Sequence, residues 1–262
     1  MPRGRSSARE VAALGARPGI RCLGQRPAAT ILALMENTFP IFIVLFVLVA
    51  GGIAYYQYLA RRQRQQAFAA FAAAHGLGYH LRDPFSLLSE PFHLLHKGDG
   101  RGIENVLDGD WSGIPIRAFD YWYYEESTDS QGHRSKTYYR FDCVLVPVEA
   151  ACTPLRIDRE NVLTRLADHL AMRDLEFELE EFNRAFSVHC EDRKFANDFL
   201  DQRMMRWLLV APGKPIFEVA YDRLLCAVKK CDVEELPVLL HTAKGFREQV
   251  PAVVYSLYPR SG

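Results

Sequence analysis

The stretch IFIVLFVLVA, residues 41–50, decides how this chain is organised, because it forms an unbroken apolar run near the N-terminus. No charged residue occurs from Asn37 to Ala60. A helix that crosses the hydrocarbon core of a bilayer needs about 20 such residues. Since hydrocarbon offers the backbone no hydrogen-bond partner, we expect this run to be helical despite its β-branched residues. The sequence therefore predicts one transmembrane helix at residues 37–60, with the lipid bilayer as its partner.

A cleaved signal peptide and a buried core helix are the alternatives for this run. The apolar region of a signal peptide usually spans about 7–15 residues and ends at small residues. Here the run is longer, and bulky residues follow Gly52. Tyr55, Tyr56 and Tyr58 gather at its end, where amphipathic rings suit the headgroup layer. We therefore expect a retained, single-pass anchor in the cell membrane.

The charges that flank the anchor predict its orientation. Arg61, Arg62 and Arg64 follow the apolar run at once, whereas Glu36 stands close before it. Lys and Arg are enriched on the cytoplasmic side of membrane helices. These three arginines are therefore the residues expected to determine topology, and the C-terminal domain is expected in the cytoplasm. They are too few for a cluster that binds anionic lipid.

Residues 1–36 are rich in Arg and Ala, with Pro and Gly, and have no clear periodicity. Met35 begins a sequence that looks like a natural start, directly before the anchor. Two interpretations stay open: the segment is disordered, or it is an over-extended start in which residues 1–34 are not translated.

The composition of the chain limits the class of protein and the compartment that we expect. Hydrophobic residues make up 49% and charged residues 24%, which is typical of a packed globular core. The formal net charge of zero argues against a nucleic-acid-binding protein, which needs a broad positive field. Five of the six cysteines follow the anchor, and an odd number cannot all pair, so we expect free thiols in a reducing compartment. The excess of Arg over Lys and the abundant Ala are typical of a GC-rich bacterial genome.

The residues after the anchor predict a juxtamembrane helix at 61–76 and an α+β domain at 77–258, which could also divide into similar halves at about 77–180 and 181–258. Aromatic and branched residues predict a hairpin of Ile114–Tyr124 with Thr137–Val148, joined by a polar loop, Glu125–Lys136. Because strands outnumber helices and turns join neighbouring strands, we expect a mainly antiparallel sheet packed by about three helices.

The other expected elements are strands at 154–158, 175–179 and 182–190, helices at 161–172 and 192–209, a tight hairpin at 216–229 and a final helix after Asp232.

Several patterns resemble catalytic or metal sites but lack a necessary part. The glycines of Lys97–Gly102 are followed by strand residues, whereas a phosphate loop needs a helix N-terminus, so a turn is the better interpretation. His93 and His96 have no third ligand near them in sequence, which a zinc site requires. Cys226 and Cys231 are spaced more widely than common metal or redox pairs. His189 and Cys190 are strand neighbours and point to opposite faces. We therefore assign no catalytic, cofactor-binding or metal-binding residue.

The aromatic strand is the most unusual feature of the domain. Tyr121, Trp122, Tyr123 and Tyr124 cannot all be buried on a sheet with one wet face. Tyr and Trp are preferred anchors of protein interfaces. One interpretation is that one face packs the core and the polar loop covers the other. The alternative is a partner-binding surface with Phe119, Tyr121 and Tyr123 as anchors.

The order of these elements resembles a known family. The anchor with its arginines, the helix ending at Gly76-Leu77, the break at Asp83-Pro84-Phe85, the strand through Phe119-Asp120-Tyr121 and the block 182–188 before Asp192 carry the resemblance. It is to bacterial, actinobacteria-like, N-terminally anchored proteins whose soluble domain has no known function. The resemblance implies a cell-membrane location and no catalytic residue. We expect a non-enzymatic interaction or scaffold domain, and the alternative is a membrane-tethered enzyme or small-ligand-binding domain whose site is formed by residues distant in sequence.

Overall fold

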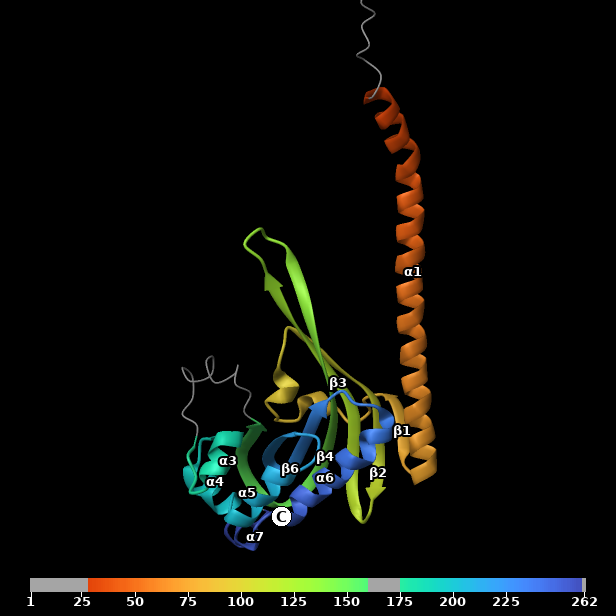
Figure 1. The fold of residues 1–262 in the computed structure, drawn as a ribbon. Coiled ribbons are helices and arrows are strands. Elements are labelled where there is room, and N and C mark those ends of the chain that lie inside the picture. Colours follow the sequence, from red (N-terminus) through yellow and green to blue (C-terminus); the bar gives the residue numbers. More distant parts are fainter. Residues whose placement is uncertain (1–27, 160–174, 261–262) are drawn as a thin grey trace, which may run out of the picture. The chain divides into compact units, whose positions relative to one another are not determined.

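The computed structural model describes residues 28–159 and 175–260, with side chains from Phe42 onward. The chain divides into two compact units, Met1–Tyr58 and Leu59–Gly262. The predicted helix at 161–172 lies outside the described residues. The predicted α+β class with an antiparallel sheet is confirmed (Figure 1).

The first element is one long helix, α1 (Ala28–His75). It joins the predicted membrane run and the predicted juxtamembrane helix without a break. Among the described residues, the part from Phe42 to His75 is long and apolar enough to cross a membrane, and its most apolar window is not buried in the structure. Gly76 then ends the helix with a positive φ of 68°, a left-handed conformation that glycine adopts at little cost.

The domain is built on an antiparallel sheet in the order β1-β2-β3-β4-β5, with β6 also paired to β4. Its strands are β1 (Gly78–Arg82), β2 (Gly100–Trp111), β3 (Ile114–Thr128), β4 (Arg134–Arg159), β5 (Phe186–Cys190) and β6 (Ile216–Lys229). β4 is the central strand, because it pairs with β3, β5 and β6 along its length. The two halves expected at 77–180 and 181–258 thus share one sheet.

Hydrophobic residues cover both faces of this sheet. The larger cluster holds the end of α1, the strand residues Ala118 and Val144, and the apolar sides of α3 (Glu180–Ala185), α4 (Arg193–Phe199), α5 (Gln202–Val210), α6 (Leu236–Gln249) and α7 (Ala252–Leu257). The smaller cluster lies on the opposite face, under the short 3₁₀ turns η1 (Leu87–Ser89) and η2 (Leu94–His96). The helices that accompany the sheet are therefore more numerous than the three expected.

Several boundaries differ from the sequence-based expectation. The strands of the β3–β4 hairpin run on through most of the predicted polar loop, so only residues 129–133 connect them. Residues 175–179 form no strand, and the predicted strand at 182–190 begins as helix α3. Residues 216–229 form one continuous strand and not the predicted hairpin, and Tyr221, with a φ of 53°, lies at an irregularity in its pairing with β4.

The predicted helix at 192–209 is two helices. Asp192 caps α4 by accepting a hydrogen bond from the Phe195 N–H, as the sequence predicted. Asp201 then caps α5 by accepting one from the Met204 N–H, which starts a new helix. The final helix α6 follows a 3₁₀ turn, η3 (Val233–Glu235), and Asp232 makes no capping hydrogen bond there.

Candidate functional site

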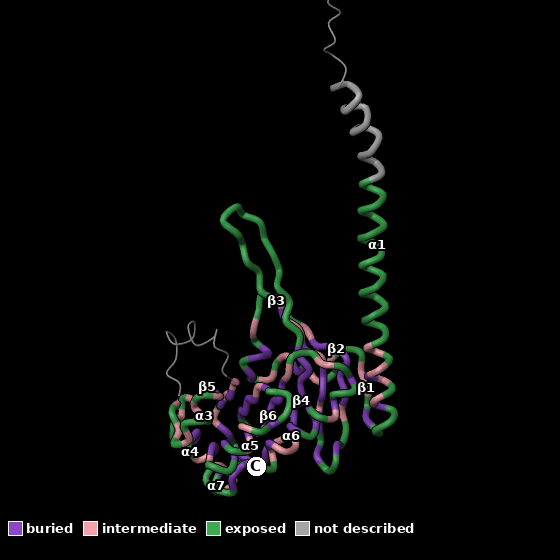
Figure 2. Tube along the Cα trace, viewed as in Figure 1, coloured by how far each residue is buried: buried purple, intermediate pink, exposed green. Residues whose placement is uncertain are grey.

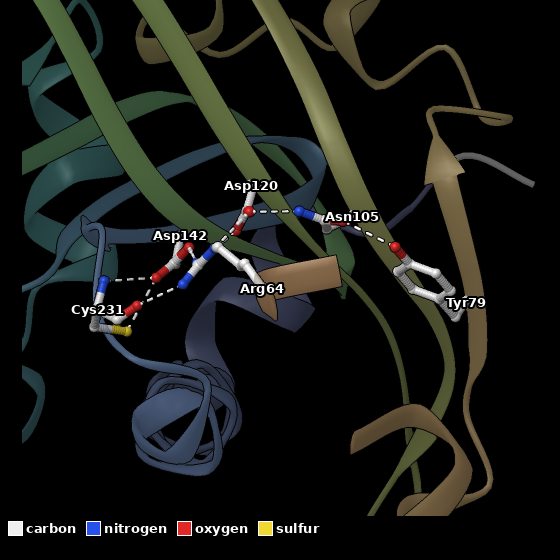
Figure 3. A network of polar contacts seen from close by, with 6 residues as sticks. All are labelled: Arg64, Tyr79, Asn105, Asp120, Asp142 and Cys231. Atoms are coloured by element: carbon white, nitrogen blue, oxygen red, sulfur yellow. Dashed lines mark hydrogen bonds and ion pairs between the residues drawn. The ribbon is translucent and has the colours of Figure 1, made fainter. Parts of the chain in front are cut away.

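A largely buried arginine of α1 forms the centre of a polar network that joins several elements of the domain (Figure 3). The Arg64 Nε and Nη2 donate to the two carboxylate oxygens of Asp120, both at 2.7 Å. Nη2 also donates to Asp142 at 2.5 Å, and Nη1 donates to the carbonyl of Cys231 at 2.8 Å. A planar guanidinium can engage several acceptors in this way because its donors point outward in a fixed fork.

The sheet register brings the two carboxylates together. Asp120 of β3 stands directly opposite Asp142 of β4. Like charges at opposed positions repel and destabilise a strand pair. The Arg64 side chain, only 12% exposed, offsets that repulsion, while Asp142 is 3% exposed. Arg64 therefore lies where its positive charge offsets the repulsion between the two carboxylates that the strand register brings together.

Apolar residues of the same helix stripe hold Arg64 in place. Phe68 and Ala72, four and eight residues after it, are 1% and 2% exposed. The Arg64 guanidinium also lies 5.0 Å from the centre of the Phe68 ring. Nearer the helix end, the rings of Phe71 and His75 lie 6.0 and 5.0 Å from the ring of Trp111. Arg64 to His75 of α1 therefore pack against the domain.

Two further side chains extend the network to the sheet edge. The Asn105 amide donates to Asp120 at 2.8 Å, and its oxygen accepts from the Tyr79 hydroxyl at 2.9 Å. Asn105 lies in a β-bulge between Glu104 and Leu107 and has a φ of 53°, which Asn tolerates better than most residues. The network therefore links α1 to β1, β2, β3 and β4.

Cys231 closes the network on the other side. Its backbone N–H donates to Asp142 at 2.7 Å, and its thiol lies 3.0 Å from the same oxygen. Burial, together with the Asp142 carboxylate, raises the pKa of the Cys231 thiol to about 12. This cysteine is consequently a protonated hydrogen-bond donor near neutral pH and not an activated nucleophile.

Burial and mutual repulsion set the protonation of the carboxylates. Burial raises the pKa of Asp142 to about 7, and the neighbouring Asp120 adds to the rise while Arg64 opposes it. Burial acts on Asp120 in the same direction, but its hydrogen bonds to Arg64 and Asp142 hold its pKa below the ordinary value. Burial alone would lower the pKa of Arg64, but the two carboxylates more than offset it and raise that pKa. The pair thus titrates jointly, with Asp142 the member that takes up a proton.

This arrangement can hold the end of α1 against the sheet, and the protonation of Asp142 can change how strongly it does so. Every donor and acceptor named above is engaged by another protein group. Arg64 is the link, because it is the residue of α1 that reaches both carboxylates. The site is therefore best described as a clamp between the end of α1 and the sheet.

The aromatic residues predicted to form a partner-binding surface lie elsewhere. Phe119, Tyr121 and Tyr123 are 1%, 1% and 5% exposed and belong to the smaller hydrophobic cluster. Burial raises the pKa of Tyr121 above its ordinary value. These residues pack the core, because β3 turns this face toward η1 and η2. The opposite face of the hairpin carries Trp122, Tyr124 and Tyr138, which are partly or fully exposed to solvent.

The three arginines predicted to determine topology differ in their surroundings. Arg61 and Arg62 are exposed, whereas Arg64 is buried in the clamp. Sequence reasoning assigned Arg64 to the flank and missed both Asp120 and Asp142. The sequence holds a feature that could have indicated each of these residues. Arg64 lies on the same side of the helix as Phe68 and Ala72, and each aspartate interrupts an apolar strand.

The histidine and cysteine pairs occupy ordinary structural positions. His93 Nδ1 lies 2.9 Å from Arg156 and His96 Nδ1 lies 2.8 Å from the Phe92 carbonyl. Cys226 is fully buried, and the Cys190 thiol lies 3.3 Å from the Asp192 carbonyl. Across residues 28–159 and 175–260, no three His, Cys, Asp or Glu side chains are grouped as metal ligands. The five cysteines from Cys143 to Cys231 are free thiols.

Comparison with known proteins gives one structural relationship. The crystal structure of the mycobacterial trehalose monomycolate transport factor A, TtfA, has a similar fold, with a TM-score of 0.51 and 13% sequence identity. The similarity covers 77% of this chain and 99% of TtfA. No protein-family model matches this chain, and no curated protein matches it. The actinobacterial character of the structural neighbour agrees in part with the resemblance found in the sequence.

Proposed function

We propose that this chain is a single-pass membrane protein whose domain lies on the cytoplasmic side and acts as a non-enzymatic accessory factor in the transport of an envelope lipid. The observation that carries the proposal is the Arg64 clamp. It makes the residues that directly follow the apolar run a structural part of the domain, so the domain sits within a few residues of the bilayer.

Membrane location is supported by the composition of α1. A helix with large exposed apolar side chains from Phe42 to Leu59 is unfavourable in water, and a bilayer removes that cost. The arginines at 61 and 62 support the cytoplasmic orientation. The free thiols of the domain support a reducing compartment.

The accessory role is supported by the fold shared with a transport factor and by the chemistry of the clamp. The carboxylates at its centre are engaged by Arg64, and the Cys231 thiol is protonated. A clamp of this kind suits a protein that positions a domain at a membrane.

Fusions at Gly262 test the orientation. We expect a fluorescent reporter that matures in the cytoplasm to be active, and a phosphatase that is active only outside to be silent. The reverse pattern would place the domain outside the cytoplasm and overturn this part of the proposal.

A deletion strain tests the transport role. We expect loss of the protein to reduce the fraction of envelope lipids that surface-labelling reagents reach, and the full chain to restore it. A chain lacking residues 37–60 should not restore it, whereas a Gln66→Ala chain, altered at an exposed and uncharged position of α1, should. An unchanged lipid distribution in the deletion strain would reject the transport role.

A further inference from the structure

We propose that the outer edge of β4 in the β3–β4 hairpin binds an extended acidic segment of a protein partner as an added strand. We call this part of β4, residues 134–140, the basic edge. Such binding goes beyond the proposed function and requires neither the anchor nor a particular orientation of the domain. When a peptide adds to an exposed sheet edge, backbone hydrogen bonds give affinity and alternate side chains give specificity.

The basic edge begins where the neighbouring strand ends. β6 pairs with β4 only from Phe141 onward, and beyond that point the Lys230 N–H donates to the Arg140 carbonyl at 3.0 Å. Among the described residues, no strand pairs with the outer side of residues 134–139. Figure 2 shows the exposed hairpin, in which every residue from 125 to 140 is open to solvent. An open sheet edge presents unpaired N–H and C=O groups that can pair with another strand.

The hydrogen bond from Lys230 defines which backbone groups of the basic edge are free. In an antiparallel strand the N–H and C=O of one residue point to the same side, and that side alternates from residue to residue. Because the Arg140 carbonyl points outward, the backbone groups of Tyr138, Lys136 and Arg134 also point outward. These residues therefore offer an added strand three N–H donors and three C=O acceptors, whereas the residues between them point toward β3.

The charges of the hairpin are divided between its two strands. Residues 133–141 include three basic side chains and no acidic one, whereas residues 124–129 include three acidic side chains and no basic one. Opposite charges on neighbouring strands stabilise a strand pair, and like charges destabilise it. An acidic strand is therefore the complement of the basic edge.

The side chains of the basic edge define the spacing that the partner needs. Those of Arg134, Lys136, Tyr138 and Arg140 share one face, because side chains alternate along a strand. Lys136 is already paired with Glu126 at 3.1 Å, whereas Arg134 and Arg140 have no ion-pair partner among the described residues. Tyr138 lies between these two arginines and is 54% exposed. An added antiparallel strand would therefore carry carboxylates at positions i and i+6, with an apolar residue opposite Tyr138.

The charges argue against a second copy of the chain as the occupant. Antiparallel pairing of two basic edges centred on Thr137 places Arg134 opposite Arg140 of the second copy. Pairing centred on Lys136 places two lysines opposite each other. Like charges in these positions destabilise the pair. Natural edge strands commonly use charge in this way to keep copies apart, and a basic edge does so while still accepting an acidic strand.

The acidic strand of a second hairpin is not free to fill this place. On the outer side of β3, the Asp99 N–H donates to the Tyr124 carbonyl at 2.9 Å. The Glu126 N–H donates to the Asp99 carboxylate at 2.7 Å. The outward groups of β3 up to Glu126 are thus engaged by the same chain, and the strand that pairs with the basic edge comes from a different protein.

Peptide binding to the full chain in dodecyl maltoside micelles tests the proposal. The probe is a seven-residue peptide with glutamate at both ends, valine at the third and fifth positions and threonine at the others, with both termini blocked, one of them by a neutral fluorophore. We expect saturable binding in the anisotropy of the fluorophore. Binding should weaken several-fold when glutamine replaces both glutamates, and also when Arg134→Gln and Arg140→Gln are combined.

Two matched pairs of changes separate strand addition from plain charge attraction. N-methylation of the fifth peptide residue removes a donor that faces β4 and should remove most of the binding, whereas N-methylation of the fourth, which faces away, should leave it unchanged. In the chain, Lys136→Pro removes an outward N–H at an edge position that tolerates proline. It should bind about tenfold more weakly than Lys136→Ala, which loses the same side chain and keeps the N–H.

Residue-resolved deuterium exchange locates the contact independently of these variants. Bound peptide should slow the amides of Arg134, Lys136 and Tyr138 far more than those of Ser135 and Thr137. The absence of saturable binding, equal affinity for the glutamate and glutamine peptides, or an equal loss on N-methylation at either position would overturn the proposal. Displacement of the probe by an oligothymidylate of equal charge as readily as by the unlabelled peptide would show that charge alone is recognised, and would also overturn it.

Discussion

Replacing Arg64 by Ala removes the cation that holds two opposed carboxylates. The Arg64 and Asp142 side chains are 12% and 3% exposed, so water cannot take over its role. Removing one member of a buried ion pair costs about 3–5 kcal/mol. We expect the lower end of this range at neutral pH, because Asp142 can take up a proton when its pKa is already about 7. With a urea slope of about 1–3 kcal/mol per M, the unfolding midpoint of the domain should fall by about 1–3 M.

The assay is urea unfolding of the full chain in detergent, followed by tryptophan fluorescence. Arg61→Ala is the matched control, since it removes an exposed arginine of the same helix and should stay within about 0.5 kcal/mol of the wild type. Arg64→Lys keeps the charge but loses the fork, so its midpoint should lie between the two. Adding Asp142→Asn to Arg64→Ala should recover part of the loss. If Arg64→Ala were no more destabilising than Arg61→Ala, the clamp would not exist as described.

Further perturbations test other parts of the structure. Burial raises the folded-state pKa of Asp142 to about 7, above its unfolded value, so the stability that its protonated form contributes is present below about pH 4 and is lost as the pH rises to about 7. Asp142→Asn should therefore flatten the dependence of the urea midpoint on pH in that window. An unchanged profile would assign the pH dependence to another group. Gly102→Ala should destabilise the domain by about 1–3 kcal/mol in thermal unfolding, because the new methyl meets the Trp122 ring, and adding Trp122→Ala should relieve the clash; additive losses would contradict this packing. Glu218→Ala should cost about 1–3 kcal/mol in urea unfolding, because the buried Leu94 N–H loses its acceptor at 3.0 Å, whereas Glu218→Gln should cost less; equal costs would refute the role of this hydrogen bond. Alkylation under native conditions should spare Cys143 and Cys226, which are fully buried with raised pKa values, and should modify them only after unfolding.

Local periodicity predicted the parts of the fold that depend on neighbours in sequence. The residues after the apolar run predicted the helix that forms the end of α1, and the branched and aromatic runs identified the β3–β4 hairpin. The predicted ends of the hairpin strands were wrong, because the polar residues 125–128 and 134–136 remain paired in strands where no core face selects apolar residues. Polarity alone therefore did not distinguish an exposed strand from a loop.

The clamp depends on register, which the sequence does not show. Asp120 and Asp142 become neighbours only because β3 pairs with β4 in one specific alignment, and Arg64 reaches them from a different element. The choice of aromatic face failed for a related reason. Alternation predicted two faces of β3 correctly, but which face lies against η1 and η2 is decided by residues far away in the sequence. The role of Gly100 and Gly102 in β2 follows only from the structure, because the rings of Tyr124 and Trp122 occupy the space that a Cβ would need.

Hydrogen–deuterium exchange across residues 61–75 of the full chain in nanodiscs tests most directly whether the end of α1 is part of the domain. A helix of this length is marginal alone in water, so its amides exchange slowly only if tertiary contacts hold it. We predict that the amides from Arg64 to His75 exchange as slowly as those of β3 and β4 in the wild type and faster in Arg64→Ala. Fast exchange of these amides in the wild type would contradict the account, because the helix would then be a tether and not a clamped element of the fold.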